Sequence, residues 1–144
     1  MTDIGSSHDL AHEKKPVTVH IISDSLGTTA ASVVRAAAVQ FDKGSVLISC
    51  LSHVSEIAQV NVYLSRFVGD GEPTAVFHTI LDPGLREELR HVLEEASIPS
   101  VDLLGPTMGI ISSLTESDPL NIPGLVVDRN VDVVRSIDAH LLIH

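Results

Sequence analysis

Residues 23–29, Ser-Asp-Ser-Leu-Gly-Thr-Thr, gather four hydroxyl groups, one carboxylate and one glycine in a single short segment. The segment follows an apolar, β-branched run and precedes an alanine-rich stretch, which is the order strand, turn, helix. Hydroxyls and the free amides at the start of a helix can together hold an anion such as phosphate. The candidate ligand-binding residues of this turn are Ser23, Asp24, Ser25, Gly27 and Thr28.

The same turn also has a purely structural interpretation. Ser23 and Asp24 are typical turn and cap residues, and Gly27 supplies backbone freedom. The carboxylate of Asp24 disfavours a bound phosphate unless a cation, from Arg35 or another arginine, lies close to it. The residue types alone therefore leave ligand binding and helix capping open.

A second polar turn, Asp-Leu-Leu-Gly-Pro, occupies residues 102–106. Asp102 would either cap the following helix or act as an acceptor or base, and both roles stay open here. Because parallel strands end on one edge of a sheet, we expect Asp102 and Gly105 to lie near the first turn. His20 and His78 fall inside predicted strands, where we interpret them as structural histidines with satisfied ring nitrogens.

The sequence does not contain a complete active site of a recognised type. Its lysines are Lys14, Lys15 and Lys43, and none follows glycines at the spacing of a Walker phosphate loop. The patterns G-x-S-x-G, C-x-x-C and H-E-x-x-H are also missing. His8 and His12 have helical i, i+4 spacing without a third ligand, so no metal site is expected. We therefore assign no catalytic residue.

Continuous apolar runs and segments with a helical apolar period must position these turns. Strands are predicted at 17–22, 46–51, 74–81 and 100–104, with a helix after each of them. The repeated strand–helix order predicts an α/β fold with an open parallel sheet. We expect the spatial order 2-1-3-4, helices on both faces, and a flavodoxin-like or Rossmann-like architecture.

Helix boundaries follow from capping residues and apolar periods. Thr28 or Thr29 is the expected N-cap of the first helix, and Ser55 that of the second. Arg86 and Arg90 are assigned to a solvated face of the third helix. We divide the chain into a disordered lead (1–16), an α/β domain (17–118), and a linker with a last helix (119–144, the helix from residue 130).

Composition narrows the possible environments. The 144 residues carry a formal charge of −10, which repels phosphate backbones and argues against nucleic-acid partners. No apolar run reaches the roughly 18 residues that a membrane helix needs. A single cysteine, Cys50, excludes an internal disulfide, and with no secretory signal we expect a cytoplasmic location.

Several ordered segments resemble the pyruvate, phosphate dikinase and phosphoenolpyruvate synthase regulatory proteins. The segments are ISDSLGTTA (22–30), VRAA (34–37), FHTIL (77–81), IPSVDLLGP (98–106) and PGL (123–125). The resemblance implies a bifunctional regulator that uses ADP to phosphorylate a threonine of the target enzyme. It implies equally that orthophosphate removes that group and pyrophosphate is released.

In this family a phosphate-binding loop lies in the C-terminal half, and the present sequence resembles only the N-terminal domain. The resemblance thus implies ADP or ATP and phosphate as ligands, held by a domain absent here. It implies pyruvate, phosphate dikinase or phosphoenolpyruvate synthase as partner, together with a homodimer or a contact with a C-terminal catalytic domain. A flavodoxin-like domain that binds a phosphate-bearing ligand, and a pure dimerisation domain, are the alternatives.

Overall fold

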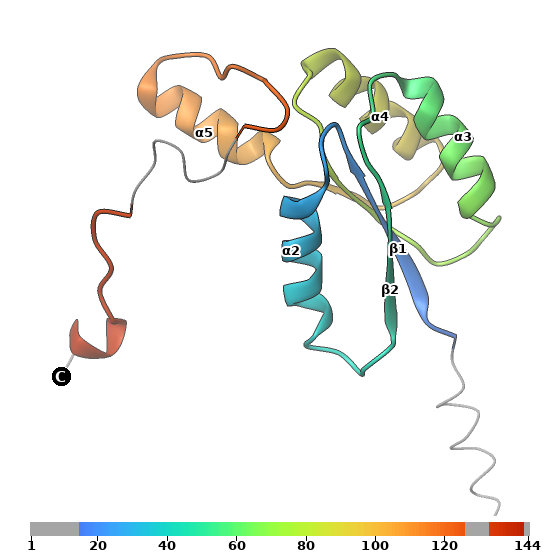
Figure 1. Ribbon diagram of the computed structural model, residues 1–144, viewed down its shortest axis with the longest axis horizontal. Coiled ribbons are helices and arrows are strands. Elements are labelled where there is room, and N and C mark those ends of the chain that lie inside the picture. The colour runs from blue at the N-terminus through green and yellow to red at the C-terminus, as the bar shows by residue number, and fades with distance from the viewer. Residues whose placement is uncertain (1–14, 126–132, 143–144) are drawn as a thin grey trace, which may run out of the picture.

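The computed structural model describes residues 15–125 and 133–142, and these ranges contain a four-stranded sheet with helices packed on it (Figure 1). No helix in these ranges is both long and apolar enough to cross a membrane. In chain order the elements are β1 (Val17–Ser23), α2 (Thr28–Ala38), β2 (Val46–Leu51), α3 (Ile57–Phe67), β3 (Val76–Thr79), α4 (Pro83–Glu95), β4 (Ser100–Asp102), α5 (Gly105–Thr115) and the 3-10 turn η1 (Ala139–Leu142).

The sheet is parallel and has the order β2-β1-β3-β4, which confirms the predicted order 2-1-3-4. β1 is an inner strand that pairs with β2 on one side and with β3 on the other. Ile21 and Ile22 are both fully buried although their side chains point to opposite faces. This two-sided burial explains why β1 is a continuous apolar run with no alternation.

Each face of the sheet has its own core. Ile21 packs with Ala30 and Val34 of α2 on one face. Ile22 packs on the other face against α3 and α4, whose buried contributions are Val60, Leu85, Leu89 and Leu93. Helices therefore cover both faces, as predicted, and β1 lies between the two cores.

A buried polar network joins two strands to a helix. His20 of β1 contacts Tyr63 of α3 through Nδ1 and Oη, which are 2.6 Å apart. The same hydroxyl lies 2.5 Å from Oγ of Ser49 in β2. Burial lowers the pKa of His20, opposed by the charge of Glu72, so the ring is neutral at pH 7. The network links α3 to β1 and β2.

Some predicted boundaries are wrong. β3 covers residues 76–79 where 74–81 was expected, and β4 covers 100–102 where 100–104 was expected. In both cases the apolar run continues into the connection that follows the strand. Leu103, for example, packs against the α2 core after β4 has ended. The hydropathy pattern predicts that these residues are buried, but it does not predict where the hydrogen bonds between strands end.

The predicted helix caps also need correction. Gly27 is the N-cap of α2, and Thr28 is already its first helical residue. The N-cap of α3 is Glu56, one residue after the expected Ser55. There, Oε1 of Gln59 accepts the amides of both Ser55 and Glu56, so a side chain inside the helix satisfies the donors that precede it.

The helix expected from residue 130 to 144 is wrong for the part that the structure describes. Residues 133–138 have no regular secondary structure, and only the short turn η1 follows them. Val133 and Val134 are exposed, so the apolar stripe that predicted this helix has no surface to pack on. The rest of that range, and residues 1–14 of the expected lead, lie outside the described residues.

We expect Tyr63→Phe to destabilise the fold by about 1–3 kcal/mol, because it leaves buried polar atoms of His20 and Ser49 without their partner. Urea unfolding measures this change. Ser65→Ala on the exposed side of the same helix is the control and should stay within about 0.5 kcal/mol of the parent. Equal effects of the two substitutions would show that the network does not hold α3 on the sheet.

Candidate functional site

The first polar turn is folded onto the end of β1. Ser23 is the buried last residue of this strand, and its Oγ accepts the amide of Ser25 at 3.0 Å. The backbone carbonyls of Ser23 and Ser25 accept the amides of Val54 and His53, at 3.0 and 2.9 Å. The turn is therefore attached to the connection that follows β2, and its conformation is set by two strands.

Asp24 contacts neither the start of α2 nor a cation of that helix. Its Oδ2 accepts the backbone amide of Leu81 at 2.7 Å, across 57 residues of sequence. Leu81 lies just beyond β3, the neighbouring strand of β1. Asp24 therefore joins the ends of two adjacent strands, a role that the alternatives of capping and ligand binding did not include. Arg35 is exposed in the last turn of α2, away from this contact.

Gly27 allows α2 to start where it does. Its φ of 85° lies in the left-handed region, and a β-carbon there would meet Sγ of Cys50 at 2.9 Å. No side chain among residues 15–125 caps the helix that follows. Thr28 is exposed at its first position. The amides of the first turn of α2 thus have no side-chain acceptor, and the hydroxyl-bearing residues Ser25 and Thr28 lie at this start of the helix.

In the second polar turn, Asp102 is a helix cap. Its Oδ1 accepts the amides of Leu104 and Gly105 at 3.1 and 2.7 Å, at the start of α5. A β-carbon on Gly105 would overlap the same carboxylate. The capping interpretation of Asp102 is confirmed. Its second oxygen, Oδ2, is turned toward α4.

Arg86 completes this edge, and its expected place on a solvated face was wrong. Its Nε and Nη2 donate to the carbonyls of Ile80 and Leu81 at 2.9 and 3.1 Å. The same Nε lies 3.6 Å from Oδ2 of Asp102. Asp24 therefore accepts the amide of Leu81, and Arg86 donates to the carbonyl of the same residue. Arg86 also lies beside the carboxylate of Asp102. We name the surface formed by residues 23–28, Arg86 and residues 102–105 the carboxyl rim.

His78 lies beneath the rim. It stands opposite Asp102 in the pairing of β3 with β4 and is 3% exposed. Burial lowers its pKa, while the charge of Asp102 raises it and that of Arg86 lowers it further. Its Nδ1 is buried without a hydrogen-bond partner in the described structure, so the expectation of a fully satisfied ring was wrong. A neutral His78 is compatible with this missing partner.

The rim carries acceptors, hydroxyls and one engaged cation. Asp24 and Asp102 bring two carboxylates, while the guanidinium of Arg86 already contacts two carbonyls and one of these carboxylates. Within the part of the chain that the structure describes, no group of three potential metal-ligating side chains is present. The donor set does not fit a nucleotide polyphosphate without cations from elsewhere. It fits a hydroxyl- or amide-bearing segment.

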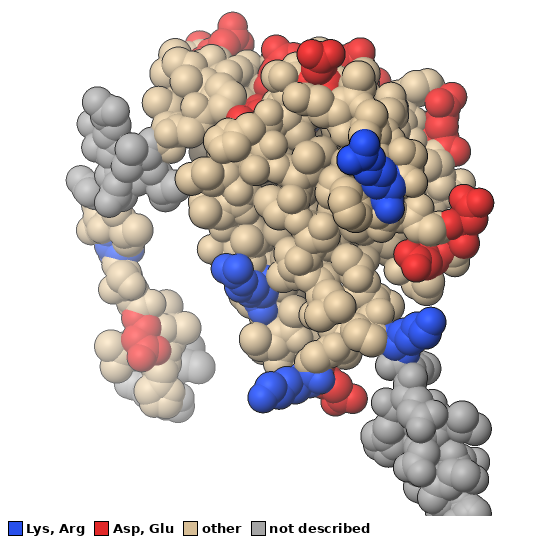
Figure 2. Space-filling view, turned by 45° about the vertical axis from the view of Figure 1, so that its right-hand side comes forward, with Lys and Arg blue, Asp and Glu red and all other residues tan. Residues whose placement is uncertain are grey.

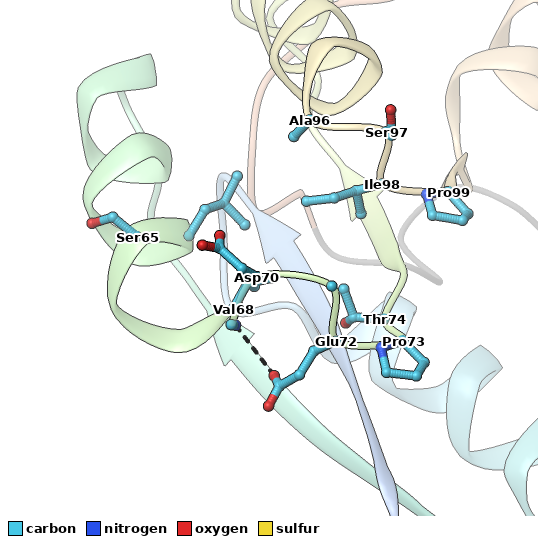
Figure 3. A pocket seen from close by; sticks show the side chains of 13 residues that line it. Ser65, Val68, Asp70, Glu72, Pro73, Thr74, Ala96, Ser97, Ile98 and Pro99 are labelled. Carbon is cyan, nitrogen blue, oxygen red and sulfur yellow. Dashed lines mark hydrogen bonds between the residues drawn. The ribbon is translucent and has the colours of Figure 1, made fainter.

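A pocket of about 880 Å³ lies at the opposite edge of the sheet. It is lined by the segments that lead into β3 and β4, with Asp70, Glu72, Thr74 and Ser97 among its residues (Figure 3). Glu72 accepts the amide of Gly69 at 3.2 Å, so its carboxylate is used within the loop itself. Since the amino ends of the strands form this edge, the pocket is separate from the carboxyl rim.

The fold and the rim define an open, doubly wound α/β domain with its polar turns at the carboxyl ends of the strands. Residues 19–140 match the family model described as kinase/pyrophosphorylase. The chain therefore belongs to the kinase/pyrophosphorylase family.

Relatives of this chain are named as regulatory proteins of pyruvate, phosphate dikinase. The Carboxydothermus hydrogenoformans protein is 36% identical over 118 residues, which are 82% of this chain and 42% of the relative. The Halalkalibacterium halodurans protein is 32% identical over 127 residues, or 88% of this chain and 46% of the relative. The chain thus spans less than half the length of these relatives.

We expect Gly27→Ala to destabilise the fold by about 2–3 kcal/mol, from the left-handed φ together with the displacement of Cys50. Gly44→Ala is the matched control, because Gly44 has a φ of 78° and open space around it. It should cost only about 1–2 kcal/mol, the backbone term alone. Thermal unfolding of both variants measures the difference. Equal losses would contradict a packing role for Gly27.

Buried neutral histidines make stability depend on pH. Because the pKa values of His20 and His78 are lowered in the fold, the unfolded chain binds more protons as the pH falls below about 6.5. Stability is fully present above that pH. It is expected to fall by up to about 1.4 kcal/mol per pH unit for each such histidine.

The comparison of variants separates this effect from general acid sensitivity. His78→Leu should reduce the slope of unfolding free energy between pH 7 and 5.5, measured by urea titration. Ser65→Ala, which removes no titratable group, is the control and should leave the slope unchanged. An unaltered slope in His78→Leu would show that the pKa of His78 is not lowered in the fold.

Proposed function

We propose that this chain is the scaffold and target-recognition part of a regulator of pyruvate, phosphate dikinase or phosphoenolpyruvate synthase. Membership of the kinase/pyrophosphorylase family and the names of the relatives support this proposal. The functional unit is residues 17–118, with 119–144 as a connecting segment. We place its action in the cytoplasm, where the lone Cys50 remains reduced.

The proposed regulation has two opposite reactions on the target. ADP donates its β-phosphoryl group to a threonine hydroxyl of the target, leaving AMP and a phosphothreonine. Orthophosphate then attacks the phosphothreonine, which restores the hydroxyl and releases pyrophosphate. Both reactions need cations that neutralise the transferred group. Residues 15–125 place carboxylates at the rim and engage Arg86 internally, so we assign the nucleotide and the phosphate to a separate half.

We assign the recognition of the target's threonine-bearing segment to the carboxyl rim. Ser25 and Thr28 present hydroxyls there, the first amides of α2 have no side-chain cap, and Asp24 supplies an acceptor that the fold already holds in place. The ligand-contacting set is Ser23, Asp24, Ser25, Gly27, Thr28, Asp102 and Gly105. The observation that carries this assignment is the chain Asp24–Leu81–Arg86–Asp102, which makes one rigid edge from two turns.

A second candidate function is a flavodoxin-like domain that holds a phosphate-bearing ligand at the first turn. The uncapped start of α2 favours it. A thermal shift with flavin mononucleotide, other mononucleotides or inorganic phosphate tests this candidate directly. A shift with a mononucleotide but none with the target enzyme would replace target recognition by this function.

Asp24→Asn is the decisive substitution at the rim, because an asparagine oxygen still accepts the Leu81 amide while the charge is removed. We expect its melting temperature to stay close to that of the parent and its affinity for purified pyruvate, phosphate dikinase to fall about tenfold, as for loss of one charged hydrogen bond. Calorimetry of the two proteins measures this. The double variant Ser25→Ala and Thr28→Val should weaken binding similarly.

Asp70→Asn is the matched control, since it removes a carboxylate at the opposite edge of the sheet. It should bind the target as the parent does. Binding that is unaffected by Asp24→Asn and by the double variant would contradict target recognition at the rim. Phosphotransfer by this chain alone, with ADP and target, would contradict the assignment of the nucleotide to a separate half.

A further inference from the structure

α5 is an apolar helix with no buried residue. α2, α3 and α4 each bury two or three residues against the sheet, whereas α5 buries none. Ile110, Ile111 and Leu114 are 65%, 53% and 79% exposed. In Figure 1, α5 projects to one side, apart from α3 and α4. Several large apolar side chains exposed on one helix indicate an interaction site.

The sequence segment that contains α5 carries acidic residues and no basic ones. No lysine or arginine occurs between Arg90 and Arg129, while Glu116 and Asp118 follow the last turn of the helix. Figure 2 shows acidic side chains gathered along the upper and right-hand margins of the face it presents, with most basic ones at the lower end. A partner for α5 is therefore apolar at its centre and basic at its border.

The position of α5 connects it to the carboxyl rim. The helix begins at Gly105, whose amide is held by Asp102. Before it comes β4, an edge strand that pairs only with β3 among the described strands. Anything that covers α5 and the free side of β4 would lie against the rim and could bring cations to it.

We propose that α5 is the docking surface for the part of the relatives' length that this chain does not match. The family match runs from residue 19 to 140 and so includes α5, while the matched relatives are more than twice as long as the region they share with this chain. In those proteins an equivalent helix has a further half of the polypeptide available to cover it. Basic groups of that half would then reach the rim. This inference rests on the function proposed above.

A second copy of this chain is a poorer occupant. Two α5 surfaces facing each other would bring Glu116 and Asp118 of both copies together with no lysine or arginine of the same segment to offset them. The half that binds the phosphate must carry cations, so its charge is complementary to that of the acidic residues beside α5.

The test uses a chimera in which this chain replaces the matched segment of the Carboxydothermus hydrogenoformans relative. Hydrogen exchange is followed in α5, in the chain alone and in the chimera. We expect exchange of the α5 amides to be about tenfold or more slower in the chimera, because a covered helix opens less often. Ile110→Asp should remove this protection in the chimera and leave the melting temperature of the chain alone unchanged.

Val62→Asp is the control, because Val62 is 51% exposed on α3 and should not alter protection of α5. Equal exchange in the chimera and the chain alone would overturn the proposal. Light scattering of the chain alone that shows a dimer dissociated by Ile110→Asp would overturn it in favour of a second copy. Binding of the target enzyme to the chain alone is measured separately, so loss of target recognition is distinguished from loss of docking.

Discussion

The hydrogen bond between Asp24 and the amide of Leu81 is the contact on which the arrangement of the rim depends. It ties the end of the inner strand β1 to the end of β3, and it leaves the carbonyl of Leu81 for Arg86. Arg86 in turn faces Asp102 at the end of β4. Three strands thus meet at one edge through a single series of charged and backbone groups. A charged hydrogen bond to a part-buried amide is stronger than one between neutral groups.

The arrangement of the strands that form this edge was predictable from the sequence. Ile21 and Ile22 lie in an unbroken apolar run, which indicates burial on both faces, and parallel strands must end on the same side. Together these features fix β1 inside the sheet and bring residues 23–28 and 102–105 to one edge. The partner of Asp24 was not predictable, because Leu81 is 57 residues away and contributes only a backbone amide, which has no signature in the sequence. Arg86 was misplaced for a related reason, since its partners Ile80 and Leu81 are carbonyls.

The helices show a second limit of prediction from periodicity. An apolar stripe predicts that a helix will be buried, and for α4 the stripe Leu85, Leu89 and Leu93 is buried as expected. In α5 the apolar residues are exposed, and at 133–138 an apolar pattern gives no helix at all. An apolar stripe shows that a helix needs a surface to pack on, and the neighbouring elements determine whether such a surface is present.

Charge explains why recognition and phosphoryl transfer belong to different halves in our proposal. A rim that holds Asp24 and Asp102 by backbone amides keeps both carboxylates oriented, which suits contact with hydroxyls and amides. The guanidinium of Arg86 joins Leu81 to Asp102, so it cannot also move to a transferred phosphoryl group without breaking these contacts. With a formal charge of −10, the chain would attract a basic surface and repel a free polyphosphate. The cations that such chemistry needs are therefore most effective when a docked half delivers them beside the rim, next to the exposed apolar helix that begins there.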